Sequence, residues 1–178
     1  MIVFHVAITT HPEYLTKREP HRREHLERLA GLRQGGAVIG GGPAPDGSSV
    51  DLVYRLQQPT QLKPAIEEDP YWLGGAWTAY RERSFAEFVE PWQLPPVVLN
   101  GSRRVTIVEG QMTDPDMAQF VMIEMRGAGR LVFGGAFPDG ATLGFMKTED
   151  AEEAKAWFAE TGFWIPESLT ARPLLHVL

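Results

Sequence analysis

The stretch Gly41-Gly42-Pro43-Ala44-Pro45-Asp46-Gly47 returns, barely altered, as Gly134-Gly135-Ala136-Phe137-Pro138-Asp139-Gly140 in the second half of the chain. A motif that recurs at long range indicates one structural unit written twice. The chain has 178 residues, which is enough for one large domain or two small ones, and the repeat favours two units that share one core. We therefore expect a tandem duplication.

The two copies differ at positions that could carry chemistry. When the halves are aligned on this repeat, His25 corresponds to Ala118. A gap of one residue then aligns Trp72 with Trp164, and Asp69 falls on Thr161. The first half thus has a His and an Asp that the second half lacks, and this asymmetry directs the search for a functional site to the first half.

The composition is that of an ordinary globular protein, with 43% hydrophobic and 22% charged residues. The net charge is −6, and the basic residues of 17–33 alternate with glutamates, so we expect no nucleic-acid partner. The lack of cysteine excludes disulfides and thiolate-bound metals. No apolar stretch has the length of a membrane span, and the N-terminus does not resemble a signal peptide. These features predict a cytoplasmic protein with no membrane partner.

Hydrophobic patterning predicts the elements of the first half. Residues 2–9 alternate as a strand does, with Val3, His5 and Ala7 on one face. A helical pattern covers 13–33, with Pro20 a possible break, and Leu26, Leu29 and Leu32 form its apolar stripe. Strands follow at 37–41 and 50–56, a helix at 62–68 that Pro70 ends, and a strand at about 77–88.

The second half repeats this order after a proline-rich linker at 91–102. We predict strands at 105–110, 130–135, 142–147 and 171–177, and helices at 114–126 and 150–160, the first with Asp114 as N-cap and Pro115 at its first position. The order is that of the ferredoxin-like split βαβ unit. The predicted fold is α+β, with domains at 1–90 and 103–178 whose sheets pack face to face.

His25 and Asp69 are the candidate catalytic residues. His25 shares a helix face with Leu29 and Arg22, so it should point toward the core, where an imidazole needs a hydrogen-bond partner. Asp69, in an extended turn before Pro70, could supply it. A carboxylate on one ring nitrogen fixes the tautomer and leaves the other nitrogen free for a substrate proton. The alternative is a satisfied core histidine and a turn that only ends a helix.

Other residues allow further interpretations. His21 and His25 are spaced like metal ligands, but no third ligand is evident, and we predict no metal. His5 could line a cavity or simply lie in the sheet. Gly40–Gly42 follows a strand without opening a helix, which favours close backbone approach over ligand binding. Tyr71, Trp72 and Trp77 could form the apolar walls of a pocket or belong to the core.

The segments Arg22–Leu29, Gly42-Pro43, Asp46-Gly47 and Asp69-Pro70-Tyr71, in this order and spacing, resemble the YCII-related proteins. The resemblance covers about residues 1–90 and implies a protein of the dimeric α/β barrel superfamily with a His-Asp active site. The fused chain would then be a pseudo-dimeric α/β barrel whose second half is a degenerate copy. It implies cofactor-free elimination or isomerisation of a small aromatic or lactone-like molecule.

Residues and resemblance together predict a lyase or isomerase that needs no cofactor and acts on a small organic molecule. His25 would be the general acid or base and Asp69 would orient it. The candidate substrate-binding residues are Arg22, His5, Gly42, Pro43, Tyr71, Trp72 and Trp77. The alternatives are a binding protein that converts nothing, a cofactor-independent or haem-binding oxygenase on the same barrel, and a structural interaction module. The sequence leaves open whether the chain is a monomer or a homodimer.

Overall fold

The computed structural model describes residues 1–90 and 96–178. The chain divides into two compact units, and the first takes in residues 1–84 together with 96–101 and 175–178. The second unit contains residues 85–90 and 102–174 of the described chain. Of the predicted linker at 91–102, residues 91–95 lie outside the described residues, and 96–101 belong to the first unit.

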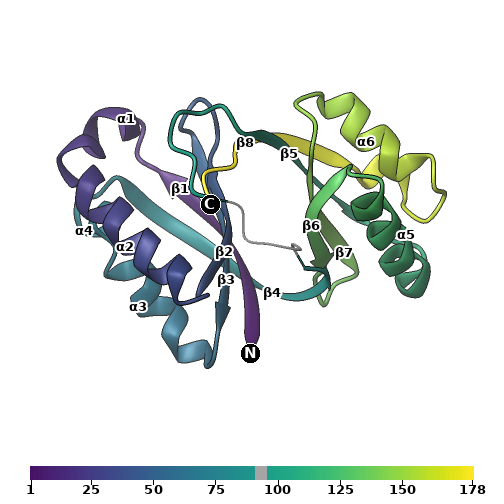
Figure 1. Ribbon diagram of the computed structural model, residues 1–178, viewed down its shortest axis with the longest axis horizontal. Helices are drawn as coiled ribbons and strands as arrows, with labels where there is room; N and C mark the ends of the chain where they lie inside the picture. Colours follow the sequence, from purple (N-terminus) through teal and green to yellow (C-terminus); the bar gives the residue numbers. More distant parts are fainter. Residues whose placement is uncertain (91–95) are drawn as a thin grey trace. The chain divides into compact units, whose positions relative to one another are not determined.

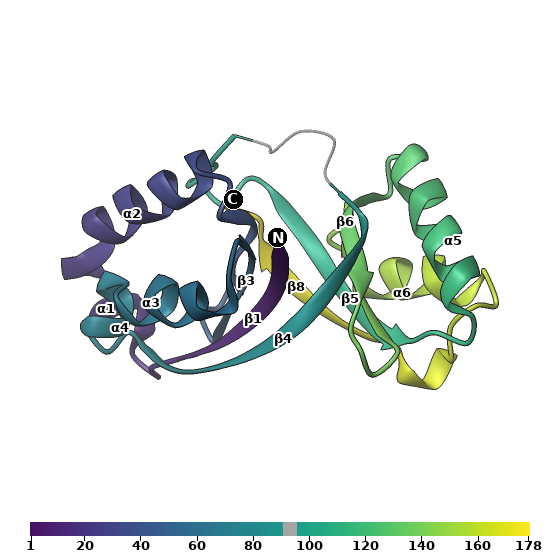
Figure 2. The same ribbon diagram turned by 90° about the horizontal axis from the view of Figure 1, so that it is seen from below.

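The first unit has the four-stranded order β2-β3-β1-β4, in which β3 pairs antiparallel with both β1 and β2. Its helices cover one face of these strands (Figures 1 and 2). The elements are β1 (Ile2–Thr10), α1 (Tyr14–Lys17), a 3-10 turn (Glu19–His21), α2 (Arg22–Gln34), β2 (Val38–Pro43), β3 (Ser49–Leu56), a 3-10 turn (Pro59–Gln61), α3 (Leu62–Glu67), α4 (Pro70–Leu73) and β4 (Trp77–Val89).

The alternation of β1 decides which side chains meet the helices. Phe4, Val6 and Ile8 pack in the apolar core of the first unit, together with Leu29 of α2. The intervening side chains, His5 among them, point to the opposite face because successive residues of a strand alternate. The helical stretch expected over 13–33 is interrupted around Pro20, which lacks the N–H that a continuous helix would use.

The second unit repeats the arrangement, with the order β6-β7-β5-β8. Asp114 and Asp150 cap the two helices by accepting hydrogen bonds from the first backbone N–H groups, and Pro115 opens the first helix as predicted. Both helices lie on one face of the strands of this unit (Figure 1). The elements are β5 (Arg104–Gln111), α5 (Pro115–Gly127), β6 (Leu131–Ala136), β7 (Ala141–Met146), α6 (Ala151–Ala159), a 3-10 turn (Pro166–Ser168) and β8 (Thr170–Leu175).

The expectation of two separate sheets needs correction, because hydrogen bonding joins all eight strands in one order, β2-β3-β1-β4-β6-β7-β5-β8. The reason is the length of β4, which has 13 residues. It neighbours β1, and its last residues pair with β6 in the second unit, Ala86 opposite Ala136. A strand that is long enough to pair on both sides makes one continuous ladder.

A further difference concerns the segment after β8. The last predicted strand, 171–177, ends at Leu175, and the following residues pack against β2 of the first unit. The backbone N–H groups of Val177 and Leu178 both donate to the carbonyl of Gly41, each at 3.1 Å. Any Cβ at Gly42 would overlap the carbonyl of Leu175. The repeated glycines therefore serve close backbone approach.

This contact predicts that Gly42→Ala destabilises the protein by about 1–3 kcal/mol, because the new methyl group must displace backbone. The free energy of unfolding in urea measures the effect. The matched control is Gly31→Ala in α2, where nothing lies within 4 Å of the new Cβ and a gain of about 0.5–1 kcal/mol is expected from helix propensity. Equal effects of the two substitutions would contradict the role of the Gly42 contact.

Candidate functional site

Asp69 is held by the turn between α3 and α4. Its backbone is extended, with φ −69° and ψ 136°, as expected before a proline. It is the N-cap of α4, and its Oδ1 accepts a hydrogen bond from the backbone N–H of Tyr71 at 2.8 Å. The residue is fully buried. Local sequence thus fixes the position of a carboxylate inside the first unit.

His25 meets this carboxylate from the middle of α2. Its Nδ1 lies 2.7 Å from Oδ1 of Asp69, and both side chains are buried. Because a carboxylate has only acceptor atoms, Nδ1 carries the shared proton. The second ring nitrogen, Nε2, is then the free position of the imidazole, and in the neutral ring it is an acceptor.

Two aromatic rings fix the plane of the imidazole. Tyr71 stacks on His25 with ring centroids 3.7 Å apart and an interplanar angle of 13°. Trp77 meets His25 edge-on at 5.3 Å and 87°. Burial raises the pKa of the Tyr71 hydroxyl well above its usual range, so this phenol stays neutral under ordinary conditions. The imidazole therefore has one orientation, set by a hydrogen bond and two rings.

The His25 ring lies on the wall of a cavity of about 120 Å³. All the lining residues belong to the first unit, and they come from α1, α2, the sheet, α4 and two segments that are distant in sequence. They are Tyr14, Arg18, Arg22, His25, Leu26, Leu29, Gly42, Pro43, Val50, Leu52, Tyr71, Trp77, Leu99, Gly101, Leu175, Val177 and Leu178. The wall is mainly apolar, with an imidazole, two phenols and two guanidinium groups as its polar members.

Most of the residues predicted from the sequence meet at this cavity. Arg22, Gly42, Pro43, Tyr71 and Trp77 line it with His25, while Asp69 lies behind the imidazole. Two other predicted residues, His5 and Trp72, are not among the lining residues.

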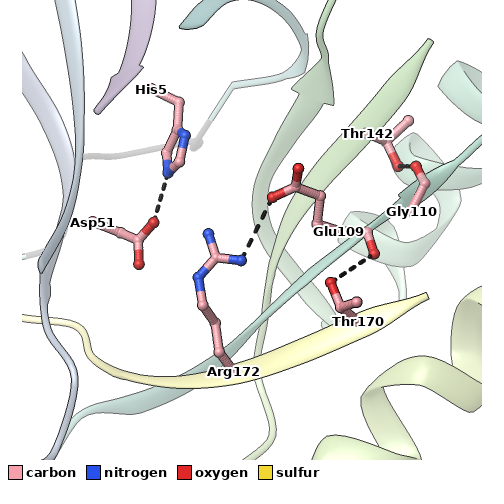
Figure 3. Close-up of polar contacts among 7 residues, drawn as sticks. All are labelled: His5, Asp51, Glu109, Gly110, Thr142, Thr170 and Arg172. Atoms are coloured by element: carbon pink, nitrogen blue, oxygen red, sulfur yellow. Dashed lines mark hydrogen bonds and ion pairs between the residues drawn. The ribbon is translucent and has the colours of Figure 1, made fainter. Parts of the chain in front are cut away.

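His5 belongs to the face of β1 that points away from the helices, and its Nε2 lies 2.7 Å from Oδ1 of Asp51 on β3 (Figure 3). Both side chains are buried, so they form a second His-Asp pair in the first unit. Trp72 is partly buried against the core of the first unit and packs edge-on against Tyr80 at 5.4 Å. Strand alternation and the α4 turn therefore place these two side chains elsewhere.

Sequence reasoning missed Tyr14, Arg18 and the segment Leu175–Leu178. Tyr14 begins α1 and is buried, and the Arg18 guanidinium lies 5.2 Å from the centroid of its ring. The interleaved charges of this stretch resemble an exposed helix face, which hid Arg18. Nothing in the sequence signals that residues 175–178 return to the first unit.

At the positions that the sequence repeat aligns with His25 and Asp69, the second unit has Ala118 and Thr161. Ala118 is buried, and Thr161 accepts a hydrogen bond from the N–H of Phe163, as Asp69 does from Tyr71. Elsewhere in this unit Arg172 pairs with Glu109 at 3.5 Å (Figure 3). The second unit therefore has a side-chain acceptor at this turn but neither the imidazole nor the carboxylate at the aligned positions.

Nowhere in residues 1–90 and 96–178 do three or more His, Asp or Glu side chains gather as metal ligands would. His21, which is spaced from His25 as a metal ligand could be, lies beside Gly74. None of the helices in this part of the chain combines the length and the apolarity needed to cross a membrane.

No family model matches the chain, and no curated protein matches it in sequence. Solved structures do match: a candidate monooxygenase of Lactobacillus acidophilus superposes with a TM-score of 0.63 at 11% identity, covering 99% of this chain and 94% of that one. A candidate monooxygenase of Fusobacterium nucleatum gives 0.59 at 8%, covering 99% and 92%. The chain shares the α+β fold of these two proteins. At these identities the likeness concerns the fold alone.

The contact between His25 and Asp69 makes a prediction about tautomers. Because the Tyr71 N–H also donates to Oδ1, an Asn at position 69 must keep its oxygen there. Asp69→Asn should therefore retain the proton on Nδ1 of His25 and remove only the charge, whereas Asp69→Ala should release the tautomer. Nitrogen-15 chemical shifts of the His25 ring test this. A proton found on Nε2 in the unmodified protein at neutral pH would contradict it.

The buried phenols predict how stability depends on pH. Burial raises the pKa of Tyr14, Tyr54 and Tyr71 in the folded state, so the folded protein keeps protons that the unfolded chain releases above about pH 10. Below about pH 10 the three phenols should leave the free energy of unfolding unchanged. Above that pH the free energy of unfolding should fall as the pH rises. Urea unfolding between neutral and alkaline pH measures this fall.

Single tyrosine variants assign the effect. Tyr71→Phe should make the fall less steep, because it removes one of the buried phenols. Tyr80→Phe should change it less, because the Tyr80 side chain is only half-buried, although burial and the bond to Glu67 also raise the pKa of Tyr80. An identical pH dependence in the Tyr71 variant and the parent protein would argue against the assignment.

Proposed function

We propose that the first unit is a cofactor-free enzyme that moves a proton on a small organic molecule, with His25 as general acid and base. The observation that carries this proposal is the buried His25–Asp69 pair at 2.7 Å, whose imidazole borders a mainly apolar cavity. A histidine that served only the core would be expected to end in packing on all sides. Here one ring nitrogen is bound and the ring also borders open space.

Each side chain has a distinct role in the proposal. His25 takes a proton from a C–H next to a carbonyl, or from a phenol, through Nε2. Asp69 holds the ring by Nδ1 and stabilises the imidazolium that forms. The proton then returns to another carbon, which is isomerisation, or to a leaving group, which is elimination. General acid-base catalysis of this kind contributes about a hundred- to ten-thousand-fold.

The cavity limits the substrate to a small molecule. Cavities of about 150 Å³ hold a single benzene ring, and this one has about 120 Å³. Tyr71 and Trp77 offer aromatic faces, which suit a planar aromatic, lactone or carbonyl compound. Arg22, one turn before His25, supplies a positive charge that can hold a carboxylate or enolate oxygen.

The YCII-like order of motifs supports the same reading for residues 1–90. In this proposal the second unit is a degenerate copy that arose by duplication, since Ala118 and Thr161 replace the pair on the same local fold. One chain then carries one site of this kind. The predicted domain division at about residue 90 belongs to the same proposal.

Solvent exchange tests the reaction directly. In deuterated water, proton NMR follows loss of the acidic C–H signals of a panel of small cyclic ketones, lactones and hydroxyquinones. The parent protein should accelerate exchange or elimination for at least one member, and His25→Ala should reduce that rate by about a hundred-fold or more. His11→Ala is the matched control, since His11 lies outside this cavity and its ring accepts a hydrogen bond from the Glu13 N–H at an exposed turn.

Two outcomes would contradict the proposal. Exchange that survives His25→Ala would remove the imidazole from the reaction. Saturable binding of panel members without exchange or elimination would leave a small-molecule binding protein. Asp69→Asn adds a graded test, because it keeps the oxygen that orients the ring but removes the charge that stabilises an imidazolium.

A further inference from the structure

We propose that the Tyr14 hydroxyl is the hydrogen-bond donor for the substrate oxygen that becomes negative when His25 removes a proton. This inference rests on the function proposed above and names a second catalytic group for it. Tyr14 lies outside the motifs that resemble the YCII-related proteins, and it lines the cavity with His25.

The Tyr14 ring is buried beside the His25 ring. Tyr14 is 4% exposed and lines the same cavity as His25. Its ring meets Tyr71 edge-on at 5.9 Å, and Tyr71 in turn stacks on His25. One shared neighbour therefore fixes both rings, so a molecule in the cavity can meet the imidazole and the phenol together.

The surroundings of the Tyr14 ring differ from one edge to the other. One edge, at Cδ1, lies beside Gly47. The Arg18 guanidinium and the Trp77 indole, which both line the cavity, influence the hydroxyl and favour its ionised form. The phenol oxygen therefore lies near two groups of the cavity wall.

The Tyr14 hydroxyl keeps its proton at neutral pH. Burial is the largest influence on Tyr14 and raises its pKa above the usual value, although Arg18 and Trp77 oppose this shift. The hydroxyl is therefore a donor at neutral pH. Arg18 adds a positive charge beside it and pairs with the exposed carboxylate of Glu19 at 3.4 Å. A phenol and a guanidinium together suit an oxygen that gains charge.

The proton and electron balance is simple. Nε2 of His25 accepts the proton of a C–H next to a carbonyl, and the electron pair of that bond moves to the carbonyl oxygen. This oxygen accepts the hydrogen bond from the Tyr14 O–H, which stays on tyrosine. When the enolate collapses, the imidazolium returns the proton to another carbon or to the departing group. No oxidant or reductant takes part.

A pair of probes tests the donor without knowledge of the substrate. 4-Nitrophenolate presents an aromatic oxyanion, and nitrobenzene has the same ring without it. Tyr14→Phe should weaken 4-nitrophenolate about ten- to hundred-fold, the range for a hydrogen bond to a charged group, and should leave nitrobenzene within about twofold. Tyr80→Phe, whose hydroxyl bonds Glu67 outside the cavity, is the matched control and should change neither. Absorbance and calorimetric titrations give both constants.

Three results would overturn the inference. Equal weakening of both probes would mean that Tyr14 only supports the fold, an unchanged preference would mean that its hydroxyl meets no oxyanion, and failure of the parent protein to bind 4-nitrophenolate would remove the oxyanion site. The exchange assay with His25→Ala separates this inference from the proposed function. If that variant loses exchange while Tyr14→Phe keeps the preference, proton transfer by His25 stands and the role of Tyr14 falls.

Discussion

The first unit is organised around one buried carboxylate oxygen, Oδ1 of Asp69. It accepts from the His25 ring and from the backbone N–H of Tyr71, so it joins α2 to the start of α4. A buried carboxylate is costly without such partners. Helix α2 and the turn that begins α4 must therefore stay in contact, since separating them would break the hydrogen bond between the buried imidazole and the buried carboxylate.

The comparison of the two units separates what the fold needs from what chemistry needs. At the turn after α3 in the first unit and after α6 in the second, a side-chain oxygen accepts from the N–H two residues on, the oxygen of Asp69 in one and of Thr161 in the other. A hydroxyl can therefore satisfy this backbone donor, as a carboxylate does. Only a carboxylate can also balance an imidazolium, and only the first unit pairs it with a histidine.

Much of this arrangement was predictable, because strands, helices and caps depend on neighbouring residues. The alternation of 2–9, the cap at Asp114 and the break at Pro20 all follow from local rules. The pairing of His25 with Asp69 could be anticipated from the need of a buried imidazole for a partner. Tyr14 and Arg18 could not, because only the packing of α1 turns them inward. The continuous strand order was missed because β4 is long enough to pair on both sides.

The docking of residues 175–178 on Gly41 and Gly42 makes the first unit depend on a distant part of the chain. Residues 1–90 contain the imidazole, the carboxylate and the aromatic rings, yet Leu175, Val177 and Leu178 line the same cavity from beyond the second unit. A protein that stopped before residue 175 would therefore lack part of the cavity wall. During synthesis, the cavity of the first unit can be completed only after the whole second unit has been made.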